Sequence, residues 1–231
     1  MTEPRQARAE VTRRRILDAA VDLFAGAGYG ETGLAEIVKQ AEVTKGAFYY
    51  HFASKEAVAT AIIEDSQSKI VEAANRAASG SAAGLESVIA KTFGIARLVQ
   101  TDRSIRIGKE LARSLTQVSD AGRNAFQVWT ADFIGEVQKA GAQGELLDDV
   151  DPDEVGEAIW VAVLGTDLLS NALADDYSTR LAEVWRVLLR GVVPGHCRTP
   201  SLGHPEGGCG RRVLPTSRNF AVDVRRGLGS H

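Results

Sequence analysis

Apolar residues recur every three or four positions from near the start of the chain, the spacing of one face of a helix. The first such helix is marked by Ile16, Leu17, Ala20, Val21 and Phe24. The glycine-rich stretch 26–30 ends this pattern. A second, short helix is predicted from Leu34, Ile37, Val38 and Ala41. We expect Thr32 to cap the N-terminus of this second helix.

Two further helices are predicted within the first 78 residues. Thr44 is expected to cap a short helix over 45–51, and Ser54 is expected to cap a long one that ends near Ala78. The two short helices are joined by the tripeptide 42–44, which gives them the dimensions of a helix-turn-helix. In that motif the second helix enters the major groove of DNA.

The rest of the chain continues in helical periodicity. Segments 85–100, 105–118 and 126–141 are predicted helices, and the sequence 151–154 supplies a cap, a proline at the first helical position and an acid. The last two helices are the most hydrophobic, with Trp160, Leu164, Leu168, Trp185 and Leu189 among their apolar residues. No segment shows the alternation of a β-strand. The predicted fold is therefore all-α, with a three-helix N-terminal module followed by a larger helical domain.

Composition describes an ordinary globular protein. Of 231 residues, 44% are hydrophobic and 25% are charged, and the net charge is −3. No apolar run approaches the length of a membrane span, and the first residues lack the apolar core of a secretory signal. We therefore expect a cytoplasmic protein that does not bind membranes. With only Cys197 and Cys209 available, no disulfide framework is expected.

Charge is distributed unevenly along the chain. Residues 1–15 contain five arginines and two glutamates, a net charge of +3. Residues 195–231 contain seven glycines, three prolines and six arginines, and we expect a disordered basic tail there. Its metal-capable side chains match no structural zinc pattern, so neither a metal nor another cofactor is expected: His196, Cys197, His204 and Cys209. The predicted domains are 1–53, 54–194 and the tail 195–231.

The short helix 45–51 has the side chains of a DNA reader. Lys45 can donate to phosphate or base acceptors, Gly46 and Ala47 permit close approach, and Tyr49 and His51 offer hydrogen-bond donors. Phe48 and Phe52, in contrast, are expected to pack this helix onto the first and fourth helices. An alternative is that its aromatic residues only form a core stripe of a helical bundle: Phe48, Tyr49, Tyr50 and Phe52.

The order of residues favours the first interpretation. The run 44–52 (TKGAFYYHF), followed by 54–56 (SKE), closely resembles the signature of the TetR family of regulators. The likeness extends over about 50 residues, through 13–20 (RRRILDAA) and 34–38 (LAEIV). A departure is Gly33, where the family usually has a hydroxyl that meets phosphate. The resemblance implies a homodimer on a palindromic DNA operator, with contacts from Arg13, Thr32, Thr44, Lys45, Gly46, Ala47, Tyr49, His51 and Lys55. Among these, Lys55 is implied to contact a flanking phosphate.

The larger domain resembles the γ-butyrolactone receptor branch of that family. The similar segments are 93–98, 163–166 and 185–191, together with the lone Trp129 of the middle helix. This resemblance implies a small lactone-type inducer and a pocket that includes Trp129, Thr166, Gln67, Phe133 and Val163. Members of the branch tend to have glutamine at the position that matches Ser66, whereas this chain has it at Gln67. The chain can therefore bind a ligand different from theirs. The plain alternative is that Trp129 is ordinary core.

Three functional alternatives are weighed against a ligand-released repressor. A multidrug-sensing repressor of an efflux pump belongs to the same family. An enzyme is disfavoured because no nucleophile motif, phosphate loop or paired carboxylate stands out. An interaction protein that has lost DNA binding is supported only by Gly33. The apolar residues of the last two helices also have two interpretations, domain core or the four-helix dimer interface that the family uses: Trp160, Leu164, Leu168, Trp185 and Leu189.

Overall fold

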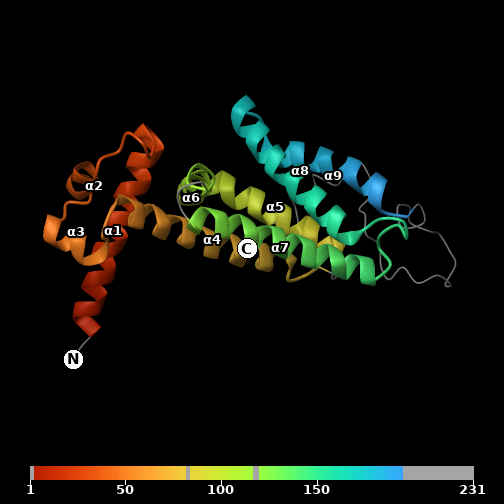
Figure 1. Ribbon diagram of the computed structural model, residues 1–231, viewed down its shortest axis with the longest axis horizontal. Helices are drawn as coiled ribbons and strands as arrows, with labels where there is room; N and C mark the ends of the chain where they lie inside the picture. The colour runs from red at the N-terminus through yellow and green to blue at the C-terminus, as the bar shows by residue number, and fades with distance from the viewer. Residues whose placement is uncertain (1–2, 82–83, 117–119, 195–231) are drawn as a thin grey trace. The chain divides into compact units, whose positions relative to one another are not determined.

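The computed structural model describes residues 3–81, 84–116 and 120–194 (Figure 1). This part of the chain forms nine α-helices and no strand, which confirms the all-α prediction. The helices are α1 (Glu3–Ala27), α2 (Leu34–Gln40), α3 (Lys45–His51), α4 (Lys55–Ala78), α5 (Leu85–Thr101), α6 (Arg103–Ser114), α7 (Asp120–Ala142), α8 (Pro152–Leu173) and α9 (Tyr177–Val192). The predicted tail, with its cysteines and histidines, lies outside the described residues.

The chain divides into two compact units that do not follow the order of the sequence. The first unit combines Met1–Val71 with Val99–Gln127, and the second combines Glu72–Leu98 with residues from Val128 onward. Helices α4, α5 and α7 therefore each contribute to both units. The domain boundary expected between residues 53 and 54 stays a prediction.

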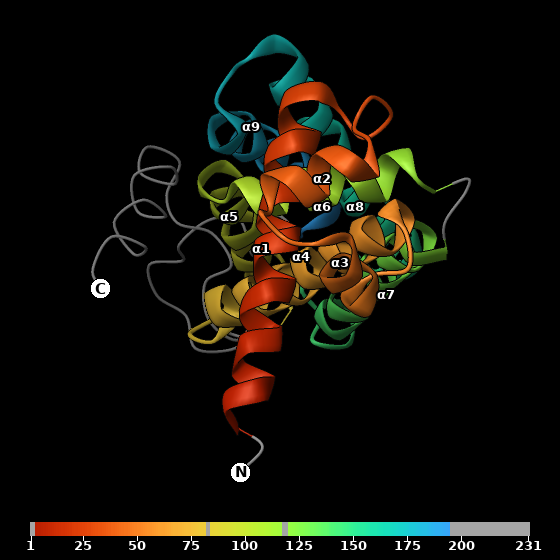
Figure 2. The same ribbon diagram turned by 90° about the vertical axis from the view of Figure 1, so that its left-hand side faces the viewer.

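The first unit is built around α1. Ile16 and Ala20 of α1, Ile37 of α2 and Phe48 of α3 are fully buried. Figure 2 views α2 and α3 from their outer side, with α1 and α4 beside them. Helix α6 belongs to the same unit and packs so closely on α4 that a Cβ atom at Gly108 would overlap the Ser66 hydroxyl.

The second unit has an aromatic core joined by a buried hydrogen-bond chain. Trp185 of α9 is fully buried, and its indole N–H donates to the Thr92 hydroxyl of α5 at 2.9 Å. That hydroxyl in turn donates to the Ile89 carbonyl at 2.8 Å. Helices α8 and α9 lie side by side (Figure 1). Within the described ranges, no helix is both long enough and apolar enough to cross a membrane.

Candidate nucleic-acid interface and ligand site

Helix α3 begins and ends as the sequence predicts. The Thr44 hydroxyl accepts a hydrogen bond from the Ala47 N–H at 3.1 Å, which caps the helix. Phe48 is fully buried and Phe52 is 5% exposed, whereas Tyr49 is 56% and Tyr50 is 72% exposed. The aromatic residues therefore divide between two roles. The two phenylalanines form core, and the two tyrosines face outward, so a core stripe does not account for all four.

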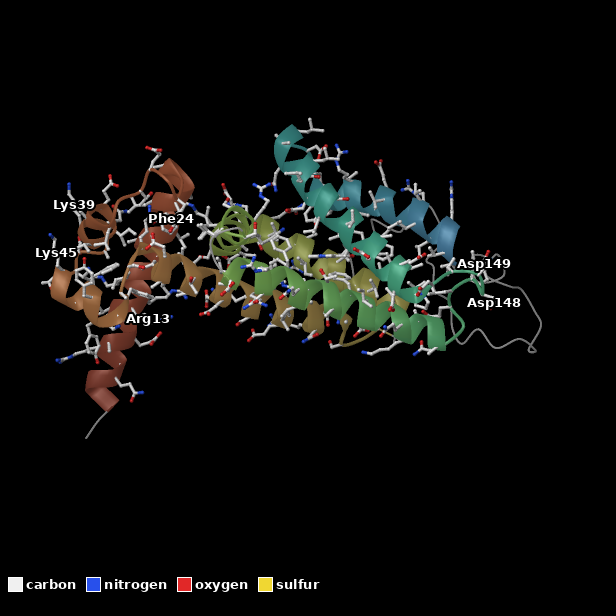
Figure 3. All side chains as sticks on the ribbon, viewed as in Figure 1. Arg13, Phe24, Lys39, Lys45, Asp148 and Asp149 are labelled. Atoms are coloured by element: carbon white, nitrogen blue, oxygen red, sulfur yellow. The ribbon has the colours of Figure 1, made fainter. Side chains whose placement is uncertain are left out.

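The outward side of α3 gathers polar and small residues. Lys45, Gly46 and Tyr49 are exposed, and Ala47 and His51 are half-buried. In Figure 3 the side chain of Lys45 points outward from α3, as that of Lys39 does from α2. A Cβ atom at Gly46 would meet nothing closer than the Thr44 hydroxyl oxygen at 3.9 Å. Nothing inside the described part of the chain requires glycine there.

Two arginines of α1 approach the helix-turn-helix. The Arg13 guanidinium lies 5.4 Å from the centroid of the Phe52 ring, at cation–π distance. Arg15 donates to the Glu42 carboxylate at 3.0 Å. Glu42 lies in the turn between α2 and α3 with a φ of 51°, in the left-handed region that non-glycine residues adopt at some cost. The Arg15 contact therefore stabilises a turn whose backbone is strained.

The start of α2 differs from the prediction. The N-cap is Gly33, whose N–H donates to the Glu36 carboxylate at 2.7 Å, and Thr32 is not the cap. Thr32 is 2% exposed, and its hydroxyl donates to the Gly28 carbonyl at 2.8 Å. The physical reason is that a longer acidic side chain one turn into the helix reaches back to the first N–H. Thr32 is thus held inside the α1–α2 loop.

Lys55 also turns inward. Its ammonium donates to the carbonyls of Tyr29 at 2.9 Å and Thr32 at 2.8 Å, and it lies 4.4 Å from the centroid of the Tyr29 ring. The Tyr29 hydroxyl donates to the Glu56 carboxylate at 3.3 Å. Burial, reinforced by the negative charge of Glu56, raises the pKa of Tyr29 to about 12. The phenol therefore keeps its proton, and its role as donor to Glu56, to a higher pH than an ordinary tyrosine.

Two of the predicted pocket residues, Trp129 and Phe133, form one buried cluster with Trp160 in the second unit. The Phe133 and Trp160 rings stack with centroids 5.0 Å apart, and Trp129 meets Trp160 edge-on at 5.9 Å. Val163 is 3% exposed. The Thr166 hydroxyl is also buried and donates to the Ala162 carbonyl at 2.6 Å. Its oxygen retains the capacity to accept from a ligand.

Gln67 is the exception among the predicted pocket residues. It is half-buried on α4 and belongs to the first unit, whereas Trp129, Phe133, Val163 and Thr166 all belong to the second. Its participation in a ligand site with them stays a prediction.

Three of the expected dimer-interface residues are buried within the single chain, which agrees with the domain-core alternative. Trp185 is fully buried, Leu189 is 4% exposed and Trp160 is 7% exposed, so their side chains already pack inside their own chain. Leu164 is half-buried and Leu168 is 51% exposed, and both stay candidates. The prediction missed other large apolar side chains that are exposed on α8 and α9: Val161, Leu169, Leu173 and Val187.

Two buried charged groups were not predicted from the sequence. Lys91 of α5, 4% exposed, donates to both carboxylate oxygens of Asp132 at 3.0 and 3.1 Å and to Glu136 at 3.2 Å. Burial would raise the pKa of Glu136, but hydrogen bonds from Lys139 and Lys91 outweigh it and hold that pKa below its usual value. The sequence does carry a sign of this ion-pair cluster. Lys91 stands among apolar residues of one predicted helix, and Asp132 and Glu136 are four residues apart on another.

The second group is Glu145, which lies in the loop after α7 and is 6% exposed. Its carboxylate accepts from the Leu85 N–H at 2.8 Å, at the first turn of α5. Burial raises the pKa of Glu145, the hydrogen bond from Leu85 opposes the shift, and the charge of Glu86 adds to it. Nothing local in the sequence indicates this contact, because the two residues are 60 positions apart.

The acidic cluster 148–154 contributes a loop and a helix cap. Asp148 and Asp149 lie in the loop between α7 and α8 (Figure 3). The Asp151 carboxylate accepts from the Asp153 N–H at 2.9 Å and caps α8, as predicted. Among the described residues, no group of three or more histidines, cysteines or acids is placed to hold a metal ion.

Comparisons with known proteins cover both parts of the chain. Residues 16–62 match the family model "Bacterial regulatory proteins, tetR family", and residues 82–194 match "Tetracyclin repressor-like, C-terminal domain". The A-factor receptor protein of Streptomyces griseus is 32% identical over 203 residues, which cover 87% of this chain and 67% of that protein.

Solved structures show the same likeness. A γ-butyrolactone receptor described as ArpA-like is 35% identical, with a TM-score of 0.67 over 82% of this chain and 91% of that one. CprB from Streptomyces coelicolor, solved in complex with its biological operator sequence, is 37% identical, with a TM-score of 0.67 over 83% of this chain and 92% of that one. The chain therefore belongs to the TetR family of helix-turn-helix transcriptional regulators and is similar to its γ-butyrolactone receptors over most of its length.

Proposed function

We propose that the chain is a repressor that binds a palindromic operator as a homodimer and is released by a small lactone-type molecule. One observation carries the DNA part of this proposal. Helix α3 buries Phe48 completely and leaves Tyr49 56% exposed beside Lys45, so it presents a polar face while anchored in the core. A similar protein, CprB, has been solved on its operator.

Each residue of that face has a role suited to duplex DNA. Lys45 donates to phosphate or to guanine acceptors, and Tyr49 and His51 donate to base edges or phosphates. Gly46 and Ala47 keep the backbone close to the DNA, which accounts for a glycine that internal packing does not require. The Thr44 hydroxyl, while accepting from Ala47, still has a proton to donate to a phosphate. Arg13 supplies positive charge from α1.

A homodimer supplies the discrimination that one short helix lacks. Recognition helices that read two half-sites are spaced by about 34–36 Å, one turn of DNA. The exposed apolar residues of α8 and α9 supply the contact surface: Val161, Leu168, Leu169, Leu173 and Val187. Large apolar side chains exposed on two adjacent helices are typical of a protein–protein interface when they gather in one patch.

The ligand is proposed to bind in the second unit against the aromatic cluster. Trp129, Phe133, Trp160 and Val163 offer apolar surface, and the Thr166 oxygen offers an acceptor. The relatives named as γ-butyrolactone and A-factor receptors support a lactone-type ligand. Ligand binding would favour a conformation whose recognition helices no longer match the DNA. Helix α4 is the proposed carrier, since it runs without a break from the first unit into the second. As a DNA-bound regulator, the protein is proposed to act in the cytoplasm and to catalyse no reaction.

Lactone-induced release tests the proposal. The probe is the duplex that the wild-type protein enriches from random DNA, and the ligand is a synthetic γ-butyrolactone with its ring-opened hydroxy acid as control. We expect the lactone to quench tryptophan fluorescence and release the duplex, and a Thr166→Val variant, which loses the proposed polar contact to the ligand, to stay bound at the same concentration. A lactone that binds without changing affinity for the duplex would contradict the proposed mechanism.

A further inference from the structure

The carbonyls of the α1–α2 loop are held by two side chains. The Thr32 hydroxyl donates to the Gly28 carbonyl, and the Lys55 ammonium donates to those of Tyr29 and Thr32, all at 2.8 to 2.9 Å. These loop carbonyls have no place in a helical hydrogen-bond ladder, so each requires such a donor or water. Two residues thus satisfy three backbone acceptors of a six-residue connection.

One of these two residues, Lys55, ties the loop to the body of the module. Lys55 is in the first turn of α4, and its ammonium also lies 4.4 Å from the Tyr29 ring centroid. Tyr29 in turn contacts Phe24 of α1 edge-on at 5.3 Å and donates to Glu56 of α4. Lys55 therefore joins the end of α1, the start of α2 and the start of α4.

This arrangement leaves little of either residue for DNA. Thr32 is 2% exposed, and its one hydroxyl proton is directed to Gly28. Lys55 has three N–H donors, of which two are used by carbonyls. Moving its ammonium to a phosphate would leave the carbonyls of Tyr29 and Thr32 without their donor.

We propose that Lys55 and Thr32 are positioning residues for DNA binding and that neither binds phosphate. Lys55 clasps the α1–α2 loop onto α4, Thr32 braces that loop from within, and together they fix the helix-turn-helix. The proposal rests on the DNA-binding role of α3 and reassigns two residues that resemblance alone would place on the DNA. Lys45 is the matched comparison, because it is the same residue type but lies exposed on α3.

The test separates positioning from phosphate contact by the salt dependence of binding. Each phosphate contact contributes about 0.9 to the slope of log affinity against log salt concentration, so loss of one lysine contact per protomer lowers a dimer's slope by about 2. We expect Lys45→Met to lower the slope by that amount. We expect Lys55→Met to weaken binding about tenfold at every salt concentration with the slope unchanged, since a lost hydrogen-bond network disturbs geometry and not counterion release.

Amide hydrogen exchange supplies the second measurement on the DNA-free protein. Lys55→Met is expected to speed exchange in 28–33, and Lys45→Met is expected to leave those amides unchanged. Thr32→Val should also speed exchange there, and Thr32→Ser, which keeps the hydroxyl, should restore the wild-type rate. If Lys55→Met fails to fold, the comparison of Thr32→Val with Thr32→Ser still tests the proposal.

A fall in slope for Lys55→Met as large as that for Lys45→Met would overturn the proposal, as would wild-type exchange in both Lys55→Met and Thr32→Val. The duplex used is the one that the wild-type protein selects from random DNA. If the wild-type protein selects none, it is the DNA-binding proposal that fails, and the exchange rates still test the clasp.

Discussion

The outward face of α3 and the aromatic cluster of the second unit use aromatic residues in opposite ways. Tyr49 and Tyr50 are exposed, held on a short helix by a Thr44 cap and a buried Phe48. Trp129 and Trp160 are buried against each other. In α3, the side chains proposed to bind DNA differ from those that stabilise the fold. In the aromatic cluster, the same side chains are proposed to bind the ligand and to stabilise the fold. Substitutions should therefore separate the two properties in α3 and not in the cluster.

The largest effect is expected for Trp160→Ala. Removing a buried aromatic ring that contacts both Phe133 and Trp129 should lower the free energy of unfolding by about 3–5 kcal/mol. Urea unfolding followed by circular dichroism measures this loss. Tyr50→Ala, at a side chain 72% exposed, is the control and should change stability by less than about 0.5 kcal/mol. Equal losses in the two variants would remove the contrast.

A smaller loss of stability is expected for Lys91→Met, which leaves the carboxylates of Asp132 and Glu136 without their buried partner. Breaking a buried pair typically costs about 3–5 kcal/mol, and since Asp132 is half-exposed we expect about 2 kcal/mol. The lowered pKa of Glu136 means that its stabilisation is present above pH 4.5 and lost as pH falls. A cycle with Glu136→Leu should show clear non-additivity. Additive losses would mean that the two groups do not interact.

Leu168→Glu tests the exposed side of the second unit. A charge at the centre of the proposed α8–α9 interface would be buried in two copies, each replacing a leucine worth about 1.5–3 kcal/mol, so dimer dissociation should rise by at least about 100-fold. Analytical ultracentrifugation measures it. Val11→Glu, at an exposed valine of α1, should leave the dimer intact. A stable Leu168→Glu dimer would place the interface elsewhere.

Tyr49→Ala tests the α3 face in isolation. Because the side chain is exposed, we expect unfolding to change by less than about 0.5 kcal/mol, while affinity for the selected duplex falls by about 1–3 kcal/mol. Fluorescence anisotropy and urea unfolding on the same preparation give both values. Loss of binding together with loss of fold would show that Tyr49 belongs to the core after all.

The smallest expected effect is that of Glu145→Gln. Since the pKa of Glu145 is raised, its charged form is disfavoured by folding, and stability declines as pH rises above the usual value of 4.5. Glutamine keeps the oxygen that accepts from Leu85 but does not titrate. The variant should match the wild type in acid and exceed it by up to about 1 kcal/mol at neutral pH. A difference independent of pH would contradict this assignment.

What the sequence predicted well are features set by neighbouring residues. The bounds of α3, its cap Thr44 and the cap Asp151 of α8 were all correct, because a side chain that caps a helix lies within three residues of its N–H partner. The division of α3 between Phe48 in the core and Tyr49 on the outside was also predicted correctly, and the burial of the two side chains agrees with it.

What the sequence did not predict depends on distant partners. Lys55 finds its acceptors 23 and 26 residues earlier, and resemblance alone assigned it to phosphate. Trp185 and Leu168 are both apolar residues of the last two helices, and only packing shows that one is core and the other exposed. The ligand site is hard to predict for the same reason, because the residues that line an apolar pocket are of the same types as those that fill the core.

The measurement that tests the account most directly is selection of bound duplexes from random DNA, with wild-type protein and a Lys45→Ala/Tyr49→Ala double variant in parallel. If α3 reads the DNA, the wild type enriches a palindrome and the double variant enriches none, although its urea unfolding matches that of the wild type. The same palindrome enriched by both proteins would show that α3 does not read the DNA. No enrichment by the wild type, even at low salt, would contradict the proposed function itself.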